Sequence, residues 1–478
     1  MLSTTTNSNN HLYEKVAHQI TGLIEQGTLQ PGERIPSVRR FSAQHGISIS
    51  TVMQAYALLE DKGLIEARPQ SGYYVRLRFR ELPPEPSISQ PPLSASRVTI
   101  SELAAKIHDA VNRPEIVPFG AACPSWNLLP TKKLNRTLAA ILRRTDYAGY
   151  SYDPVVGNLQ LRHQIARRSL DWGCHLSEND IVITVGCTEA LNLCLRATAN
   201  PGDTIAVESP TYFGFLQIIE NLKMKALEIP TDPKEGISLT ALAAAIKKRV
   251  VKACLLMPNF QNPLGSFMPE EKKMELIKML GRHGLPLIED DLHGDLHHGA
   301  ERPKPVKAFD KHGIVLLCSS FSKTLSPNYR VGWTAPGKFK TEVERLKLTN
   351  TVVTASLPQM AIAEMMQNGG YDHYLRKLRR AFASQVQLTA CAICKYFPAG
   401  TKVTRPLGGF ILWVELPKSV NALRLYQQAL EAKISIVPGP IFSAKQRYQN
   451  FIRISCGHPW SIELEQALAK LGQLASEI

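Results

Sequence analysis

The sequence predicts a multidomain protein in which a small, mainly α-helical domain precedes a large α/β body. Three observations lead to this prediction. The chain has 478 residues, too many for one ordinary domain. Its first eighty residues have the pattern of three short helices and a β-hairpin. From residue 118 onward, short apolar runs alternate with helix-length segments, which is typical of βαβ units and a largely parallel sheet.

The composition favours a soluble protein of the cytoplasm. Hydrophobic residues make up 44% of the chain, yet no run reaches the roughly 18 apolar residues that a membrane span needs. The first ten residues lack the basic and then apolar pattern of a signal peptide. Nine scattered cysteines argue against a disulfide framework, and no spacing predicts a metal site. Cys391 and Cys394 have redox-like spacing, but we expect a pair of buried core thiols.

The net charge of +15 is compatible with a polyanionic partner, but its distribution does not locate a binding site. Residues 1–80 contain nine Lys or Arg and six Asp or Glu, a net charge of +3. Residues 119–478 contain 44 and 30, a net charge of +14. Most of the excess positive charge therefore lies in the body, outside the small domain.

The small domain has the pattern of a helix-turn-helix followed by a wing. An apolar stripe at helical spacing covers residues 12–26 and stops at Gly27. Ser37 is the expected N-cap of a second helix, and Ser50 is the expected N-cap of a third helix over residues 51–62. Two short runs, at residues 64–68 and 73–75, flank a tight turn and predict the wing.

A helix-turn-helix binds DNA when the N-terminal end of its second helix enters the major groove. Other small helical domains are interaction modules, and the pattern alone leaves that alternative open. For DNA, the candidates for base contacts are polar residues at the N-terminal end of the third helix: Ser48, Ser50, Thr51 and Gln54. The candidates for contacts to phosphates or to a groove edge are Arg34, Ser37, Arg39, Arg40 and Arg68.

Four motifs of this domain resemble the winged helix of GntR-family regulators. They are Pro-Gly-Glu-Arg-Ile-Pro-Ser-Val-Arg-Arg (31–40), Ser-Thr-Val-Met-Gln-Ala-Tyr (50–56), Leu-Glu-Asp-Lys-Gly-Leu-Ile (59–65) and Ser-Gly-Tyr-Tyr-Val (71–75). The resemblance implies double-stranded DNA as a partner. One position departs from the family, because Ile49 stands where those regulators usually have a basic residue just before the recognition helix. This position therefore lacks the basic side chain through which those regulators would contact a phosphate or a base directly.

A proline-rich segment separates the small domain from the body. Residues 81–96 contain five prolines among serines, so they cannot form a helix and predict an extended spacer. Such a spacer would span roughly 50 Å as polyproline or about 22 Å as a flexible coil. We expect three parts: a winged helix-turn-helix domain (1–76), a linker with a connecting helix (77–117) and a body (118–478).

Apolar runs of the body predict the strands of its sheet, at residues 181–185, 204–207, 253–257, 286–289 and 314–318. Later runs and a helix from Ser461 predict a C-terminal α+β subdomain, with strands at residues 409–415, 434–437 and 451–455. Ligands of α/β proteins gather at the carboxyl ends of parallel strands. A binding site is therefore expected in the loops that follow the strands of the sheet.

The segment after the strand at 314–318 contains the groups that an aldehyde-and-phosphate cofactor requires. In Ser-Phe-Ser-Lys-Thr-Leu-Ser-Pro-Asn-Tyr-Arg (320–330), Lys323 has an amine that can form a Schiff base with a carbonyl group. Ser320, Ser322 and Arg330 are good phosphate ligands. This combination predicts pyridoxal 5'-phosphate. The alternative is a surface lysine and arginine on either side of a serine-rich turn.

The chemistry of this cofactor predicts further groups, which the other loops supply. A carboxylate should hold the ring nitrogen, and we assign Asp291. Asn262 is the expected donor to the phenolic oxygen, and Tyr212 is the expected cover of the ring. Arg453 is expected to bind the carboxylate of an amino-acid ligand. The phosphate should meet a helix N-terminus, which offers the amides of Cys187 and Thr188. Each residue could instead serve a turn or the surface.

The motifs Asn-Pro-Leu-Gly (262–265), Asp290-Asp291, Ser-x-Ser-Lys (320–323) with Arg330, and Arg453 resemble those of the fold-type I aminotransferases. The resemblance implies the roles given above, with Lys323 as the site of an internal aldimine. It also implies a homodimer in which Tyr152 reaches the phosphate of the other subunit. His293 departs from the family, which usually has a tyrosine there that hydrogen-bonds the phenolic oxygen. An imidazole can donate the same bond but titrates near neutral pH; a structural histidine is the alternative.

The order of winged helix, proline-rich segment and aminotransferase-like body is similar to that of the MocR subgroup of GntR regulators. The resemblance implies a transcription regulator that binds DNA and pyridoxal 5'-phosphate and senses an amine, an amino acid or a B6 vitamer. The alternative is a working aminotransferase with an accessory DNA-binding domain, because the sequence keeps each residue that half-transamination needs. The sequence alone leaves enzymatic turnover open.

Overall fold

The computed structural model describes residues 12–25, 28–29, 33–62, 64–68, 71–75, 82–111, 113, 115–144 and 152–478. Contacts within the chain divide it into two units, Met1–Leu82 and Pro83–Ile478. Gly27, at which the apolar stripe of the first helix stops, lies outside the described residues, as do Pro31, Gly32 and Gly63. Within the described ranges, no helix combines the length and the apolar character that crossing a bilayer requires.

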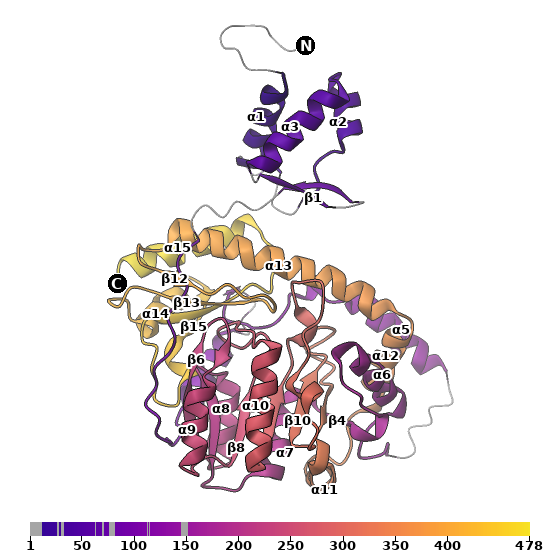
Figure 1. The fold of residues 1–478 in the computed structure, drawn as a ribbon, viewed down its shortest axis with the longest axis vertical. Helices are drawn as coiled ribbons and strands as arrows, with labels where there is room; N and C mark the ends of the chain where they lie inside the picture. The colour runs from indigo at the N-terminus through magenta and orange to yellow at the C-terminus, as the bar shows by residue number, and fades with distance from the viewer. Residues whose placement is uncertain are drawn as a thin grey trace. The chain divides into compact units, whose positions relative to one another are not determined.

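The first unit is a three-helix domain with a β-hairpin, as the sequence predicts (Figure 1). Its elements are α1 (Leu12–Glu25), α2 (Val38–His45), α3 (Ile49–Asp61), β1 (Ile65–Arg68) and β2 (Gly72–Val75). The two strands pair antiparallel and form the wing. α3 packs against α1 and α2, and its Tyr56 hydroxyl donates to the Pro36 carbonyl at 2.8 Å. This bond ties the turn before α2 to the core of the domain.

Serine caps set the beginnings of α2 and α3, with one correction to the prediction. Ser37 caps α2 as predicted, because its hydroxyl accepts from the Arg40 amide at 3.3 Å. Ser48, not Ser50, caps α3: its hydroxyl accepts from the Thr51 amide at 3.1 Å. The backbone of Ser48 is extended (φ −58°, ψ 145°), so the helix begins at the next residue.

The proline-rich segment is non-helical, as predicted, but it is not a free spacer. Residues 83–100 belong to the second unit and lie along the body. The Val403 amide donates to the Pro84 carbonyl at 2.9 Å, and Ser96 pairs with Ala226 at the edge of the main sheet. The helix α4 (Ser101–Val111) follows. Composition indicates the conformation of such a segment, but not the surface against which it packs.

The second unit is built on an eight-stranded sheet with the order β4-β11-β10-β9-β8-β5-β6-β7. The predicted strands are present as β4 (Val182–Thr184), β5 (Thr204–Ser209), β8 (Ala253–Leu256), β9 (Leu287–Asp290) and β10 (Val315–Ser320). Three strands that the sequence did not predict join them: β6 (Lys225–Asp232), β7 (Gly236–Ile237) and β11 (Gly332–Ala335). The run from β10 through β9, β8 and β5 to β6 is parallel. The carboxyl ends of these strands therefore share one edge of the sheet.

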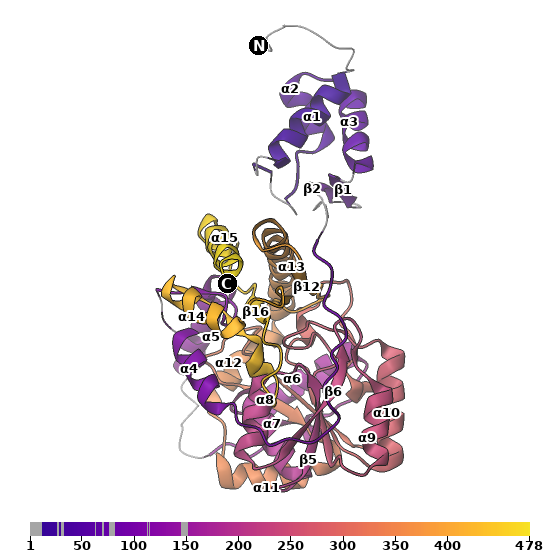
Figure 2. The same ribbon diagram turned by 90° about the vertical axis from the view of Figure 1, so that its left-hand side faces the viewer.

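Helices cover both faces of this sheet. In Figure 2, α9 (Leu239–Lys247) and α10 (Glu270–His283) lie on one side, and α7 (Gly186–Thr198) and α8 (Phe213–Asn221) lie on the other. The remaining helices before the C-terminal part are α5 (Thr131–Arg143), α6 (Leu159–Ser169), α11 (Lys340–Asn350) and α12 (Ser356–Gln367). Short 3-10 helices occur at Trp126–Leu128, Leu170–Trp172, Glu178–Asp180, Gly294–Leu296, Val306–Phe309, Gly337–Phe339 and Gly439–Phe442.

The C-terminal part is an α+β subdomain, as the sequence predicts. Its sheet consists of β12 (Lys402–Val403), β13 (Ile411–Glu415), β16 (Phe451–Ser455) and β15 (Val437–Pro438), in that order. A further strand, β14 (Ile434–Ser435), pairs with β3 (Val117–Pro118). The helices are α13 (Gly370–Tyr396), α14 (Ala422–Glu431) and α15 (Ile462–Ser476). On α13, Cys394 is exposed and Cys391 is half-buried, so the expectation of two buried thiols was wrong.

Candidate functional site

Lys323 lies in the turn after β10, at the carboxyl edge of the parallel strands, as the sequence predicts. Its amine interacts with Cys123, Arg453, Arg330 and Asp290. Burial lowers the pKa of Lys323 below its usual range, and the positive charges of Arg453 and Arg330 lower it further. A lysine with a lowered pKa is more often neutral at physiological pH, and the neutral amine is the form that reacts with a carbonyl group.

Asp290, not Asp291, belongs to the cluster that Lys323 forms with Cys123, Arg330 and Arg453. Asp290 is the last residue of β9 and Asp291 follows it, and successive side chains of an extended chain point to opposite sides. The Asp290 carboxylate interacts with Lys323 and accepts from the Cys187 thiol at 3.7 Å and from the Leu292 amide at 3.0 Å. Burial raises the pKa of Asp290 to about 7. The assignment of Asp291 from the sequence is therefore corrected, because its neighbour is the carboxylate on the lysine side.

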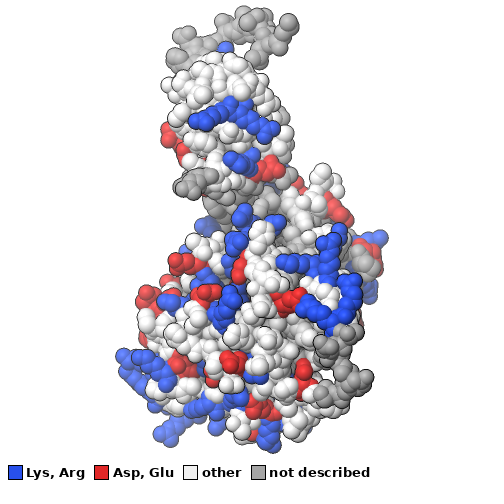
Figure 3. Space-filling view, turned by 90° about the vertical axis from the view of Figure 1, so that its right-hand side faces the viewer, with Lys and Arg blue, Asp and Glu red and all other residues white. Residues whose placement is uncertain are grey.

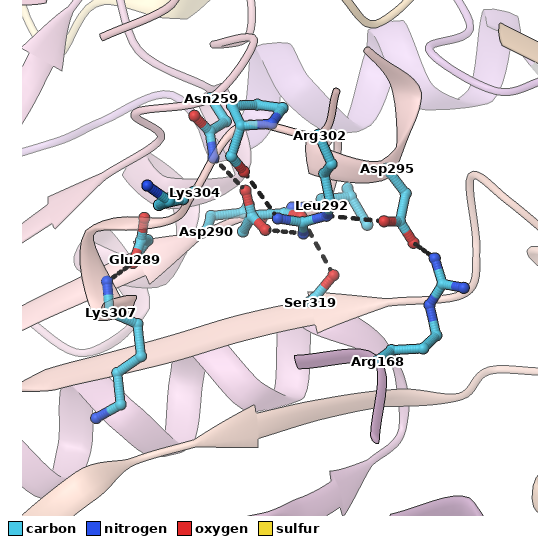
Figure 4. A network of polar contacts seen from close by, with 12 residues as sticks. Arg168, Asn259, Glu289, Asp290, Leu292, Asp295, Arg302, Lys304, Lys307 and Ser319 are labelled. Carbon is cyan, nitrogen blue, oxygen red and sulfur yellow. Dashed lines mark hydrogen bonds and ion pairs between the residues drawn. The ribbon is translucent and has the colours of Figure 1, made fainter. Parts of the chain in front are cut away.

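Asp291 belongs instead to a buried network of charged residues, through its contacts with Arg302 and Asn259. Figure 4 shows Arg302 and Asn259 together with Asp295 and Arg168. Arg302 joins two carboxylates, because it forms an ion pair with Asp291 and another with Asp295, in which Nε and Oδ1 are 2.8 Å apart. Asn259 donates to Asp291 at 2.8 Å, and Arg168 lies 3.5 Å from Asp295. Burial alone would raise the pKa of Asp295, but the two arginines outweigh it and hold that pKa below its usual range. The network holds the Asp291 carboxylate beside Arg302 and Asn259 just after β9.

Arg453 reaches the cluster from β16 of the C-terminal subdomain. Its side chain is buried; Nη1 donates to Asn262 Oδ1 at 3.3 Å, and Nη2 donates to the Gly120 carbonyl at 2.5 Å. Its Nε has no hydrogen-bond partner among the described residues. Burial lowers the pKa of Arg453 to about 10. Both recorded partners of the guanidinium are neutral oxygens, so its charge is available to an acidic ligand.

His293 is buried beside Lys323 and Arg453, and its environment fixes its protonation. Its Nδ1 lies 2.9 Å from the Phe260 carbonyl. Because a carbonyl only accepts, Nδ1 carries the hydrogen and Nε2 presents a lone pair. Nε2 is buried without a partner in the described part of the chain. Burial lowers the pKa of His293 to about 4, and the charges of Lys323 and Arg453 contribute. Two expectations were therefore wrong: His293 does not titrate near neutral pH, and Nε2 is not a donor.

The candidate phosphate ligands meet at the N-terminus of α7. Arg330 has a left-handed backbone (φ 50°), and its Nη2 donates to the Val185 carbonyl at 3.3 Å. A Cβ at Gly186 would lie 2.4 Å from that nitrogen, so the arginine can lie against the helix because this residue is glycine. The nearby strand end contributes Ser320 and Ser322, both buried. The first turn of α7, where the helix dipole favours an anion, contains Cys187 and Thr188.

The two candidate tyrosines differ in their surroundings. Tyr212 precedes α8, and its ring lies against Gly214, where a Cβ would approach the ring to 2.4 Å. It interacts with Arg453 and Asp290, and burial raises its pKa. Tyr152 is 82% exposed and lies outside the cluster of its own chain. Its expected contact with another subunit stays a prediction.

The candidate DNA-contacting residues lie on the surface of the first unit. Arg34, Arg39, Arg40 and Gln54 are exposed. Ser48, Ser50 and Thr51 gather at the start of α3, whereas the side chain of Arg68 lies outside the described part. On the face drawn in Figure 3, Lys and Arg side chains form a group on the first unit. On the second unit, groups of basic side chains alternate with Asp and Glu.

Three parts of the site were not predicted from the sequence: Asp290, Arg302 and the Gly120 carbonyl. For Asp290 a signal exists, because alternation along β9 places it and Asp291 on opposite faces. The sequence does not say which face α7 covers, so the choice between the two stayed open. Arg302 comes from an irregular loop and Gly120 contributes only backbone, and neither has a sequence pattern.

The fold and the site define a class of protein. A winged helix-turn-helix is joined to a body with the architecture and the lysine-centred site of the aminotransferases that depend on pyridoxal phosphate. The chain belongs to the family described as aminotransferase class I and II, which it matches over residues 127–471. Its first unit matches the family of bacterial regulatory proteins named gntR over residues 12–75. The resemblance to the MocR subgroup is thereby confirmed.

Two relatives match nearly the whole length of the chain. The HTH-type transcriptional regulator YdcR of Escherichia coli strain K12 is 42% identical over 465 residues, 97% of this chain and 99% of YdcR. The regulator YjiR of the same strain is 38% identical over 96% of this chain and 98% of YjiR. LysN, the α-aminoadipate aminotransferase of Thermus thermophilus, was solved with N-(5'-phosphopyridoxyl)-L-leucine. It has a TM-score of 0.72 and 27% identity, and the match covers 80% of this chain and 99% of LysN.

Proposed function

We propose that the chain is a transcription regulator that binds DNA through its first unit and pyridoxal 5'-phosphate through its body, and that an amine, an amino acid or a B6 vitamer is its effector. The observation that carries this proposal is the meeting of Lys323, Asp290 and Arg453 in one buried cluster of a chain with a gntR domain. A location in the cytoplasm is part of this proposal.

Unpaired atoms of the cluster support the fit of the cofactor and a ligand. His293 Nε2 and Arg453 Nε are buried without a partner among the described residues, and such atoms are costly unless a ligand or water completes them. Lys323 would hold the cofactor covalently, Asp290 its ring nitrogen, Asn262 its phenolic oxygen and Tyr212 its ring face. The phosphate would be held by Ser320, Ser322, Arg330 and the amides of Cys187 and Thr188. When bound, pyridoxal phosphate supplies an electron sink next to an amine carbon.

The protonation of each group suits its role. The lowered pKa of Lys323 favours the neutral, nucleophilic amine. The pKa of Asp290, about 7 in the protein alone, falls when a cation lies beside it, because an opposite charge favours the carboxylate. By the same attraction, an ionised Asp290 holds a proton on the ring nitrogen.

Arg453 favours an effector that has a carboxylate. Its guanidinium is held by Asn262 and Gly120, which fix its orientation without neutralising its charge. A planar guanidinium binds a carboxylate through two parallel hydrogen bonds. Among the three effector classes, an amino acid uses both Lys323 and Arg453, so we rank amino acids first.

The segment that leads from the first unit provides a path between effector and DNA. Ser89 Oγ donates to the Ser209 carbonyl at 2.5 Å. Ser209 is the last residue of β5, and a short loop leads from it to Tyr212. A change in the position of Tyr212 can therefore move Ser209, three residues away, and through it Ser89 in the segment that leads to the first unit. Such a contact can transmit an effector signal if the protein has two conformations, with and without effector, that differ in their affinity for DNA.

We also propose a homodimer with shared sites. The support is the high exposure of Tyr152, together with a role for this tyrosine that the resemblance to aminotransferases implies. Analytical ultracentrifugation tests the dimer. Mixing a Tyr152→Phe chain with a Lys323→Ala chain tests the sharing, because a mixed dimer would contain one site with both changes and one with neither.

Footprinting on the protein's own upstream region tests the regulator. We expect protection at low salt, where phosphate contacts are strongest, and a change in protection when an amino acid is added to the loaded protein. Lys323→Ala should keep the protection and lose the change, whereas Lys377→Ala, at an exposed lysine of α13, should keep both. Absence of protection at low salt would refute DNA recognition at this region.

A working aminotransferase is the second candidate. Retention of Lys323, Asp290 and Arg453 in one cluster favours it. The acceptor character of His293 Nε2 favours the regulator, because the site lacks the donor that the enzymes usually have there. Rapid conversion of an amino acid to its keto acid, with 2-oxoglutarate as acceptor, would establish the enzyme.

A further inference from the structure

The N-terminal half of α3 presents an exposed apolar pair. Ile49 is 50% exposed and Met53 is 55% exposed. The two residues are four positions apart, so their side chains lie on one line along the helix. The opposite side of α3 faces the core through Val52, Ala55, Tyr56 and Leu59. The apolar pair is therefore not needed for the packing of the domain, and it occupies the end of the helix that a helix-turn-helix inserts into DNA.

The hydroxyl groups beside this pair are engaged with one another. Ser48 Oγ accepts from the Thr51 amide at 3.1 Å. It also lies 2.9 Å from Ser50 Oγ and 2.7 Å from Thr51 Oγ1. Three of the four expected base-contacting residues thus form the cap of α3. The side chains at this end of the helix that remain for base recognition are therefore Ile49, Met53 and Gln54.

The charge distribution matches insertion of this end into a DNA groove. The first eleven residues of α3, residues 49–59, have no charged side chain, and the acidic Glu60 and Asp61 come at its far end. The exposed Arg39 and Arg40 lie on α2. Phosphate contacts can therefore come from α2, while α3 brings neutral side chains to the bases.

We propose that Ile49 and Met53 recognise thymine through its C5-methyl group in the major groove. This methyl is the apolar group that base pairs present there, and apolar side chains contact it. Gln54 lies on the adjacent line of the same helix and suits the N6 and N7 atoms of an adenine. A basic residue, which is usual at the position of Ile49 in the GntR family, suits guanine or a phosphate instead. The operator is therefore read at A·T pairs by this end of α3. The inference rests on the proposed DNA binding and adds the base that is read.

Removal of single methyl groups from the DNA tests the inference. The footprinted segment is synthesised with deoxyuridine in place of one thymine at a time, and Kd is measured by fluorescence anisotropy. We expect at least one thymine in each half-site whose replacement weakens binding about fourfold, the effect of losing one buried methyl group. Ile49→Ala or Met53→Ala should weaken binding to the thymine duplex and abolish the difference between the two duplexes.

Leu12 provides a matched control, because it is 54% exposed on α1. Leu12→Ala should keep both the affinity and the deoxyuridine effect, and circular dichroism verifies the fold of each variant. Equal losses of affinity on thymine and deoxyuridine duplexes in both α3 variants would overturn the inference and leave DNA binding intact. Failure of the unchanged protein to bind the duplex at low salt would overturn the proposed function as well.

Discussion

Replacement of His293 by tyrosine tests how the site sets the protonation of its cofactor. In the structure, Nδ1 donates to the Phe260 carbonyl, so Nε2 offers only a lone pair. A tyrosine hydroxyl would offer a donor instead. Loss of the proton from the linkage between Lys323 and the cofactor leaves more negative charge on the phenolic oxygen, and a donor stabilises that charge. His293→Tyr should therefore lower the pH midpoint of the cofactor's absorbance change.

The size of this shift follows from the strength of one hydrogen bond. A hydrogen bond to a charged group contributes about 1.5–3 kcal/mol, and one pKa unit corresponds to about 1.4 kcal/mol. The midpoint should move down by about one to two pH units. The pKa of His293 itself is about 4, so its own titration does not distort the wild-type curve near neutral pH.

The assay is a spectrophotometric pH titration of the loaded protein. His293→Phe is the control, because it removes the lone pair without adding a donor and should move the midpoint less than tyrosine does. Thermal unfolding of both variants checks the packing of this position against Phe410, whose ring centroid is 5.7 Å away. A midpoint in the tyrosine variant that is unchanged or higher would refute the view of His293 as a neutral acceptor.

Three further changes test other links between site and DNA. Lys323→Ala should abolish the visible absorbance of the loaded protein and leave DNA affinity unchanged, as measured by spectroscopy and filter binding. Arg39→Ala should weaken binding to all DNA sequences alike and reduce the slope of log K against log salt by about one. Ser89→Ala removes the bond to the Ser209 carbonyl. In anisotropy titrations of this variant, the Kd for DNA should differ less between the protein with effector and the protein without it. The affinity for the effector itself should change little.

Periodicity and cap residues were enough to predict the first unit and most of the main sheet. These two signals failed for strands whose residues are unfavourable in a strand. β6 contains Pro230 and acidic residues, which argue against a strand. It forms because the proline lies at the last pair of its ladder with β5, opposite Ser209. The packing of residues 83–100 on the body could not be predicted either, because an extended segment has no apolar period that would reveal its partner.

The prediction of the site was correct where a segment contains a single residue with the required chemistry. It was wrong where two adjacent residues of the same type could fill the same role. Lys323 and Arg453 are the single candidates in their segments, and the structure brings them together. Asp290 and Asp291 are chemically equal, and the choice depends on which helix covers which face of β9. The protonation of His293 depends on the Phe260 carbonyl, a backbone atom 33 residues away, and no sequence pattern encodes that contact.

The two adjacent aspartates can be separated by asparagine variants with opposite effects. The pKa of Asp290 is about 7 in the folded protein and about 3.9 in an unfolded chain. Because the folded value is the higher one, the unfolded chain binds fewer protons between these values, and stability falls as the pH rises from about 4 to about 7. Asp290→Asn removes this loss, so it should stabilise the cofactor-free protein above about pH 7 by up to about 4 kcal/mol. The same change should weaken cofactor binding and shift the visible absorbance band, because asparagine has no negative charge to hold a proton on the ring nitrogen.

Asp291→Asn should do the reverse, because it leaves the buried Arg302 with one of its two carboxylates. Breaking a buried ion pair costs about 3–5 kcal/mol, while the Asp290 carboxylate and the absorbance of the folded fraction remain. Urea unfolding of the cofactor-free variants at pH 5 and pH 8, followed by titration with pyridoxal phosphate, measures both effects. If Asp291→Asn weakened cofactor binding and shifted the band while Asp290→Asn did neither, the ring nitrogen would have to lie on the Arg302 side of β9. The cluster around Lys323 would then not be the cofactor site.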